Sequence, residues 1–189
     1  MNKLFTCAGA AVLTLLSTSA FAQGTASHQI ELQGNANARC SVPAYPTKPE
    51  GDADLLSGAT AASSTVLFNG FTTDSGRGNA STATLQFAGV WCNQAATMEL
   101  TSNNRGLDAG EPAPPGFVSK VHYIAEADWA GGVTDLTLDT STGDSASDET
   151  EDANAGDLVV KITTVPDATK LLLAGHYEDA LTISITPIL

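Results

Sequence analysis

The sequence predicts an all-β sandwich, and three observations lead to that fold class. Seven or eight short segments are rich in β-branched, aromatic or alternating residues. Clusters of Gly, Pro, Asn and Asp separate these segments, as turns separate strands. No stretch combines a 3.6-residue apolar period with helix caps at its ends. The 189-residue chain has no clear internal repeat, and its length suits a single domain with a substantial core.

The first 22 residues have the composition of a secretory signal peptide. Lys3 supplies the positive charge, residues 4–16 form an apolar run, and Ala20-Phe21-Ala22 is a small-x-small cleavage site. The apolar run is too short to span a bilayer as a stop-transfer helix. Cys7 precedes most of this run, so we assign it to the leader. We therefore expect export through the periplasm and a mature chain that begins at Gln23.

The charge of the chain excludes some classes of partner. Its 21 acidic and 8 basic residues give a formal net charge of −13. Nucleic acids and anionic membrane surfaces both require a Lys/Arg patch. No apolar run after the leader is long enough to cross a membrane. We therefore expect neither nucleic-acid binding nor membrane insertion.

The most informative pattern covers residues 29–42. Even positions are apolar or small and odd positions are polar, without interruption over fourteen residues. Such alternation is typical of a half-buried strand, which would be roughly 46 Å long at 3.3 Å per residue. A domain of this size is only about 35–40 Å across. Part of this strand is therefore predicted to belong to the sheet of another molecule.

Two cysteines lie outside the leader, Cys40 and Cys92. An even pair in an exported chain indicates a disulfide, and here only one connectivity exists. The bond would contribute roughly 4 kcal/mol in the chain-entropy model. Free or metal-bound thiols are the alternative. We expect Trp91 to pack on the disulfide in the core.

The middle of the chain alternates between strands and loops. Strands are predicted at residues 64–71, 83–92, 97–101, 120–129, 136–138 and 158–165. Connections are predicted at residues 50–64, 103–116 and 139–157. The third connection is acidic and of low complexity, and it lacks the EF-hand register of a calcium loop. We interpret it as a solvated, flexible loop, with calcium binding left open.

The C-terminal segment, residues 174–189, contains the strongest strand signal. Leu181, Ile183 and Ile185 alternate with polar residues, and Tyr177 falls on the same face of the predicted strand. Two interpretations are open. The segment is either an ordinary sandwich strand or a strand that borders a gap in its sheet and receives a partner strand.

No constellation for catalysis or metal binding is recognisable. The three histidines are far apart in sequence, and neither a G-x-S-x-G elbow nor a P-loop is present. We expect no catalytic residues, no metal and no cofactor.

Several segments together resemble one family. Residues 30–42 (I-E-L-Q-G-N-A-N-A-R-C-S-V) are similar to the N-terminal extension of chaperone–usher pilins. Residues 90–107 resemble the second-cysteine segment of the spore coat protein U-like branch of these secreted proteins. Residues 120–127 and 174–185 are similar to later strands of that branch. The resemblance spans most of the mature chain in patches.

The resemblance implies an incomplete immunoglobulin-like sandwich that lacks its final strand. A periplasmic chaperone would fill the gap first, and the extension of a neighbouring pilin subunit would replace it, with an outer-membrane usher as the export partner. The implied donor-strand residues are Ile30, Leu32, Gly34 and Ala36. The implied residues of the C-terminal strand that faces the chaperone or donor are Tyr177, Leu181, Ile183 and Ile185.

The expected organisation is a signal peptide (1–22), a donor extension (23–39) and a pilin-like domain (40–189). The expected function is that of a non-enzymatic subunit of a surface fibre, a fimbrium, for adhesion or biofilm formation. One alternative is a self-complete, monomeric β-sandwich adhesin or coat protein, whose own N-terminal strand closes its own gap. A secreted β-sandwich hydrolase is the less favoured alternative, because no nucleophile and base are recognisable.

Overall fold

The computed structural model describes residues 31–43, 46, 50–55, 64–133 and 135–188. The predicted signal peptide and Ile30 lie outside these residues. The chain divides into two compact units, residues 1–35 and 36–189. In the first unit, the described residues 31–35 form no strand and their side chains are exposed. The fourteen strands found among the described residues all belong to the second unit.

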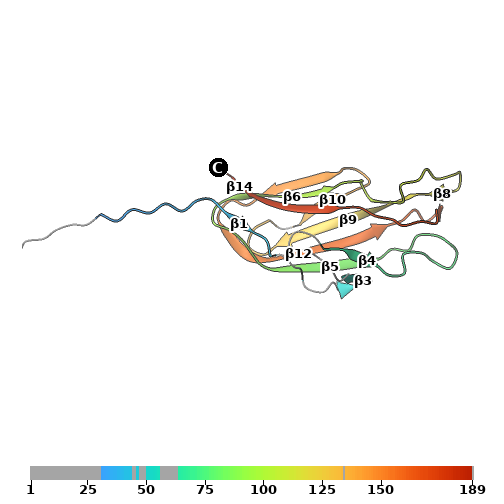
Figure 1. The fold of residues 1–189 in the computed structure, drawn as a ribbon, viewed down its shortest axis with the longest axis horizontal. Coiled ribbons are helices and arrows are strands. Elements are labelled where there is room, and N and C mark those ends of the chain that lie inside the picture. Colours follow the sequence, from blue (N-terminus) through green and yellow to red (C-terminus); the bar gives the residue numbers. More distant parts are fainter. Residues whose placement is uncertain (1–30, 44–45, 47–49, 56–63, 134, 189) are drawn as a thin grey trace, which may run out of the picture. The chain divides into compact units, whose positions relative to one another are not determined.

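The second unit is a sandwich of two antiparallel sheets (Figure 1). The larger sheet has the order β1 (Cys40–Ser41), β5 (Thr82–Cys92), β12 (Asn154–Val165), β9 (Lys120–Trp129) and β10 (Leu136–Asp139). To it are added β2 (Glu50–Gly51), which pairs with β5, and β7 (Leu107–Asp108), which pairs with β9. The smaller sheet has the order β11 (Ser145–Glu149), β6 (Ala96–Ser102) and β14 (Leu181–Pro187).

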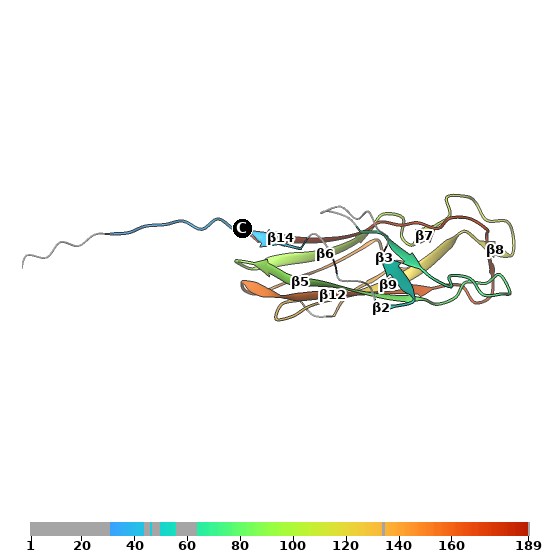
Figure 2. The ribbon, with the colours of Figure 1, turned by 60° about the horizontal axis from the view of Figure 1, so that its bottom comes forward.

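Two short ribbons accompany the sheets. Strands β3 (Ala53–Leu55) and β4 (Val66–Phe68) pair antiparallel and lie near β5 (Figure 2). Strands β8 (Phe117–Val118) and β13 (Leu171–Leu172) pair in parallel.

The core forms between the sheets because period-two alternation places apolar side chains on one face of each long strand. On β6, Met98 and Leu100 are fully buried. On β9 the odd-numbered residues face inward and end at Trp129, which is also fully buried. The indole nitrogen of Trp129 donates to the carbonyls of Val90 and Gly156 at 3.4 and 3.3 Å. A large amphipathic ring is thus buried with its polar atom paired.

The structure confirms the predicted all-β sandwich and most of its strands. Strand β9 has the predicted bounds, 120–129, and β5, β6, β10 and β12 overlap the predicted segments. The disulfide between Cys40 and Cys92 is confirmed, and it joins directly facing residues of β1 and β5.

Two of the expectations are wrong. Residues 139–157 are not one flexible loop, because β11 pairs with β6 and β12 already begins at Asn154. Trp91 does not pack in the core: its side chain is 39% exposed, since it points to the face opposite Cys92.

Short strands also occur inside two segments that were expected to be connections. Strands β2 and β3 fall within residues 50–64, and β7 falls within residues 103–116. Each contains only two or three residues, too few for a period-two pattern to be visible.

Candidate functional site at the free edge of strand β14

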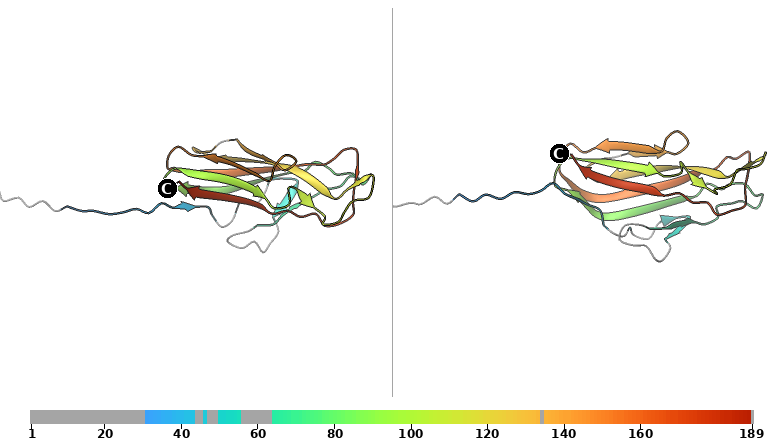
Figure 3. Two further views of the ribbon diagram at one scale, coloured as in Figure 1. Left: turned by 90° about the horizontal axis from the view of Figure 1, so that it is seen from above. Right: turned by 45° about the horizontal axis from the view of Figure 1, so that its top comes forward.

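Strand β14 pairs with β6 along one side. The antiparallel register runs from Leu181 opposite Ser102 to Pro187 opposite Ala96. Figure 3 shows β14, in red, with the green β6 beside it in the smaller sheet. Among the residues that the structure describes, no strand pairs with the other side of β14.

The hydrogen bonds at the two ends of this ladder show which backbone groups remain free. The amide of Asn103 donates to the carbonyl of Ala180 at 3.0 Å, and the amide of Ile188 donates to the carbonyl of Ala95 at 2.9 Å. Hydrogen-bonded pairs alternate with non-bonded pairs in an antiparallel ladder. Ala180 and Ile188, at the two ends, are both bonded and both even-numbered, so the even-numbered residues between them also bond to β6. The amides and carbonyls of Leu181, Ile183 and Ile185 point to the free edge.

The side chains of the same three residues face the core. They pack against the buried cluster, yet each is only partly buried. Their neighbours Met98 and Leu100 on β6 are 0% exposed. The free edge of β14 thus combines unpaired backbone groups with incompletely covered aliphatic side chains. Both features would be satisfied by one added strand whose alternate residues are apolar.

The start of β14 is anchored by Asp179, which accepts several hydrogen bonds. Its Oδ2 accepts from the hydroxyl of Ser102 at 2.5 Å and from the hydroxyl of Tyr123 at 2.8 Å. Its Oδ1 accepts from the amide of Asn104 at 2.8 Å. The pKa of Tyr123 is raised, mainly because burial disfavours the phenolate. This cluster joins both sheets to Asp179, two residues before the edge strand begins.

Sequence reasoning missed this cluster, although one signal was present. Tyr123 lies at an inward-facing position of the alternating segment 120–129, where a buried hydroxyl requires a partner. The far end of β14 is held as well, because the side-chain amide of Gln94 donates to the carbonyl of Ile188.

Tyr177 is not part of this edge strand, which corrects the predicted face. It precedes β14, and its hydroxyl donates to the carbonyls of Leu173 and Val118 at 2.8 and 3.0 Å. Its ring contacts Phe71, with the ring centroids 5.3 Å apart. The structure therefore brings together Leu181, Ile183 and Ile185, and it separates Tyr177 from them.

The N-terminal segment was expected to be one strand over residues 29–42, but of its described residues, 31–42, only Cys40 and Ser41 are in a strand. Ile30, the first implied donor residue, lies outside the described residues. The described donor residues Leu32, Gly34 and Ala36 are exposed and outside any strand, with the Leu32 side chain 90% exposed. In a single chain, residues 31–39 lack a ladder partner among the described residues.

The chain becomes attached to the sandwich at Asn37, through the turn that contains Asn93. The side-chain amide of Asn93 donates to the carbonyl of Asn37 at 2.8 Å. The backbone of Arg39 exchanges two hydrogen bonds with Asn93, one to the side-chain oxygen at 2.7 Å and one from the amide at 3.0 Å. Together with the disulfide at Cys40, these bonds determine where the N-terminal segment joins the domain. Strand β1 in turn contacts β14.

No protein-family model matches this chain, and no match was found among curated proteins. No group of three or more His, Cys, Asp and Glu residues is placed to hold a metal ion within the described part of the chain. The same part contains no helix that is long and apolar enough to span a membrane.

Proposed function

We propose that this protein is a secreted, non-enzymatic, pilin-like subunit that assembles into a surface fibre by donor-strand exchange. The observation that carries the proposal is the free edge of β14. Its odd-numbered residues offer backbone hydrogen-bonding groups and half-covered aliphatic side chains on the same side. The proposed occupant is the N-terminal extension of a neighbouring copy, with Ile30, Leu32, Gly34 and Ala36 at the apolar or small positions.

The strand order supports an immunoglobulin-like sandwich without its last strand. A constant-type immunoglobulin domain has strands A, B, E and D in one sheet and C, F and G in the other. The order β1, β5, β12, β9 corresponds to the first sheet, and β6 next to β14 corresponds to C and F. Strand G would lie on the free side of β14, where the described residues place no strand. The donor segment would supply it.

The energetics favour an occupied edge. Exposed, unpaired strand edges next to apolar side chains promote aggregation. Burying two aliphatic side chains, such as Ile30 and Leu32, contributes on the order of 3–6 kcal/mol before entropy losses. A periplasmic chaperone that covers β14 until assembly, and an outer-membrane usher for export, belong to this proposal. The fibre would serve adhesion or biofilm formation at the cell surface.

The test uses the full secreted chain with Ile30→Asp and Leu32→Asp combined. We expect the double variant to fold with an unchanged melting temperature and to form no polymers, because its charged positions would enter only a neighbour's core. Size-exclusion chromatography and thermal unfolding measure the two properties. The matched control combines Gln33→Asp with Asn35→Asp, which adds the same charge at polar positions of the same segment and should leave assembly intact.

The alternative, a self-complete sandwich, gives the opposite result. If the segment closed the gap of its own domain, the double variant would place two charges in its own core and unfold it. An unfolded double variant from a wild type that is a stable monomer would refute donor-strand exchange.

A further inference from the structure

A cavity lies on the outer face of the larger sheet, at the end far from the disulfide. Its volume is about 590 Å³. In β9 and β12, His122 faces Val165 and Ile124 faces Thr163, whereas Asn154 pairs with Cys92 at the opposite end of the same sheet. The cavity thus lies at the end of the domain that contains β8, on the right in Figure 1. We name it the distal cavity; the lining residues used below are Phe117, His122, Ile124, Asp139, Val165 and Asp167.

The distal cavity has an apolar floor that water contacts. Inward-facing residues of β9 are odd-numbered, so Ile124 lies on the outer face, diagonally across from Val165 of β12. Val165 is 48% exposed and Phe117, from β8, is 37% exposed. An aromatic ring beside two aliphatic side chains suits a ligand with a flat C–H face.

Two carboxylates are held in fixed orientations at the rim. One oxygen of Asp139 accepts from the amide and hydroxyl of Ser141 at 2.9 and 2.6 Å. One oxygen of Asp167 accepts from the amide and hydroxyl of Thr169 at 2.8 and 2.6 Å. These hydrogen bonds lower the pKa of both carboxyl groups, so both are ionised at neutral pH. Each therefore offers strong acceptor positions for O–H donors.

Lysine and histidine side chains complete the lining of the cavity. The ammonium group of Lys120 is held outside the cavity, by Asp108 at 3.0 Å and by the carbonyl of Asn104 at 2.7 Å, whereas Lys170 lies 3.6 Å from Asp167 at the opening. His122 has one ring nitrogen 3.5 Å from the hydroxyl of Thr140. Positive and negative groups are thus interspersed over the same small opening.

The mixture of positive and negative side chains around the opening determines which class of ligand the cavity can bind. An anion would meet two ionised carboxylates on a chain whose net charge is −13. A cation would meet the ammonium group of Lys170, which already pairs with one of the two carboxylates, Asp167. A neutral molecule with many hydroxyl groups could form hydrogen bonds with the charged side chains. If it also has one C–H face, that face could pack on the apolar side chains of the cavity. We propose that the distal cavity binds a neutral saccharide unit.

The distal cavity does not depend on the proposed donor-strand exchange. It lies on the outer face of the larger sheet, whereas β14 belongs to the smaller sheet. A strand added to β14 would leave the cavity open to solvent. Failure of the assembly test and failure of saccharide binding are therefore separate results.

The test is a titration of the full secreted chain with methyl glycosides of glucose, mannose and galactose and with N-acetylglucosamine, followed by NMR. We expect saturable binding of at least one of them, with a dissociation constant on the order of millimolar for a ligand of this size. Val165→Arg, which fills the cavity from an exposed position, should abolish it. In the variant that combines Asp139→Asn with Asp167→Asn, the side-chain oxygens can still accept the hydrogen bonds from Ser141 and Thr169, but both negative charges are removed. This variant should bind roughly tenfold more weakly.

The matched control is Lys161→Gln, on the same outer face of β12 but paired with Glu126 outside the cavity. It should bind as the wild type does. Thermal unfolding of every variant confirms that it is folded. Absence of saturable binding of all four sugars, or binding that both cavity variants leave unchanged, would overturn the proposal. Tighter binding of inorganic phosphate than of any sugar would overturn the proposed ligand class.

Discussion

At the scale of single residues, the hydroxyl of Tyr123 connects the larger sheet to the segment just before the edge strand. It donates to Asp179, which also accepts from Ser102 of β6. A buried phenol that donates to a carboxylate is a stronger contact than an ordinary neutral hydrogen bond. The same burial makes the phenolate form unfavourable and couples folding to alkaline pH.

Tyr123→Phe tests this coupling. The pKa of Tyr123 is raised in the folded state from its ordinary value of 10.0. The folded protein then holds this proton more tightly than the unfolded chain, so the stabilisation is present below pH 10 and is lost as pH rises above 10. We expect the variant to lose about 1–3 kcal/mol at pH 7 and to show a shallower alkaline decline. Urea unfolding between pH 7 and pH 11 measures both, and parallel pH curves would contradict the assignment.

The disulfide is expected to contribute a large part of the domain's stability. It closes a separation of 52 residues, between Cys40 and Cys92. Replacing both by Ser should reduce the free energy of unfolding by roughly 4 kcal/mol or prevent accumulation. Urea unfolding of the double variant gives the value, with the reduced wild type as the control. A loss below about 1 kcal/mol would show that the hydrogen bonds of Asn93 suffice to hold β1.

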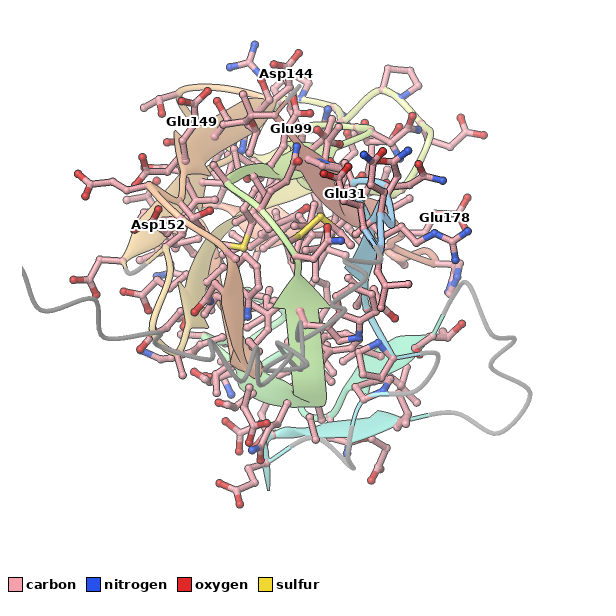
Figure 4. All side chains as sticks on the ribbon, turned by 90° about the vertical axis from the view of Figure 1, so that its left-hand side faces the viewer. Glu31, Glu99, Asp144, Glu149, Asp152 and Glu178 are labelled. Carbon is pink, nitrogen blue, oxygen red and sulfur yellow. A yellow bond between two sulfur atoms is a disulfide. The ribbon has the colours of Figure 1, made fainter. Side chains whose placement is uncertain are left out.

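At the scale of elements, the two edges of the smaller sheet differ in kind. Strand β11 is short, and acidic side chains surround it. Figure 4 labels three of them, Glu99, Asp144 and Glu149, on one side of the domain. The end of β11 is secured by Thr150, whose amide donates to the carbonyl of Ala96 at 2.8 Å. Charges of this kind disfavour edge-to-edge pairing, so the acidic segment protects one edge while β14 offers the other.

A proline in β14 tests the direction of its backbone groups. The amide of Ile183 points to the free edge, so Ile183→Pro should keep the pairing with β6 and slow polymer extension roughly two- to tenfold. Ile183→Ala is the control for the lost side chain. Ser184→Pro removes an amide that faces Glu99 of β6 and should destabilise the subunit itself by about 1–3 kcal/mol. Equal effects of the two prolines on the melting temperature would contradict this register.

At the scale of the whole molecule, the net charge of −13 opposes association of identical subunits. The screening length falls from about 30 Å at 0.01 M salt to about 8 Å at 0.15 M. Polymerisation, followed by light scattering, should therefore accelerate several-fold over this range. The variant with Ile30→Asp and Leu32→Asp is the control and should remain unpolymerised at both concentrations. An unchanged or slower rate at high salt would indicate that charge repulsion does not limit assembly.

Sequence alone determined the features that depend on neighbouring residues. Alternation over 120–129 and 181–186 is a local property, and the corresponding strands occur where it predicts them. The disulfide followed from the count of cysteines outside the leader. The exposure of Trp91 could also have been predicted from the sequence, because adjacent residues of a strand face opposite sides and Cys92 is buried.

Only the tertiary structure decided what depends on contacts between distant segments. Strand β11 lacks an apolar period because it lies at a polar edge, so its pairing with β6 was not visible in the sequence. Tyr177 was separated from the β14 face because its hydroxyl is held by Leu173 and Val118 before the strand begins. The free edge itself depends on register. An alternating strand looks the same with one neighbour or two, and only the pairing of β14 with β6 reveals which backbone groups are left over.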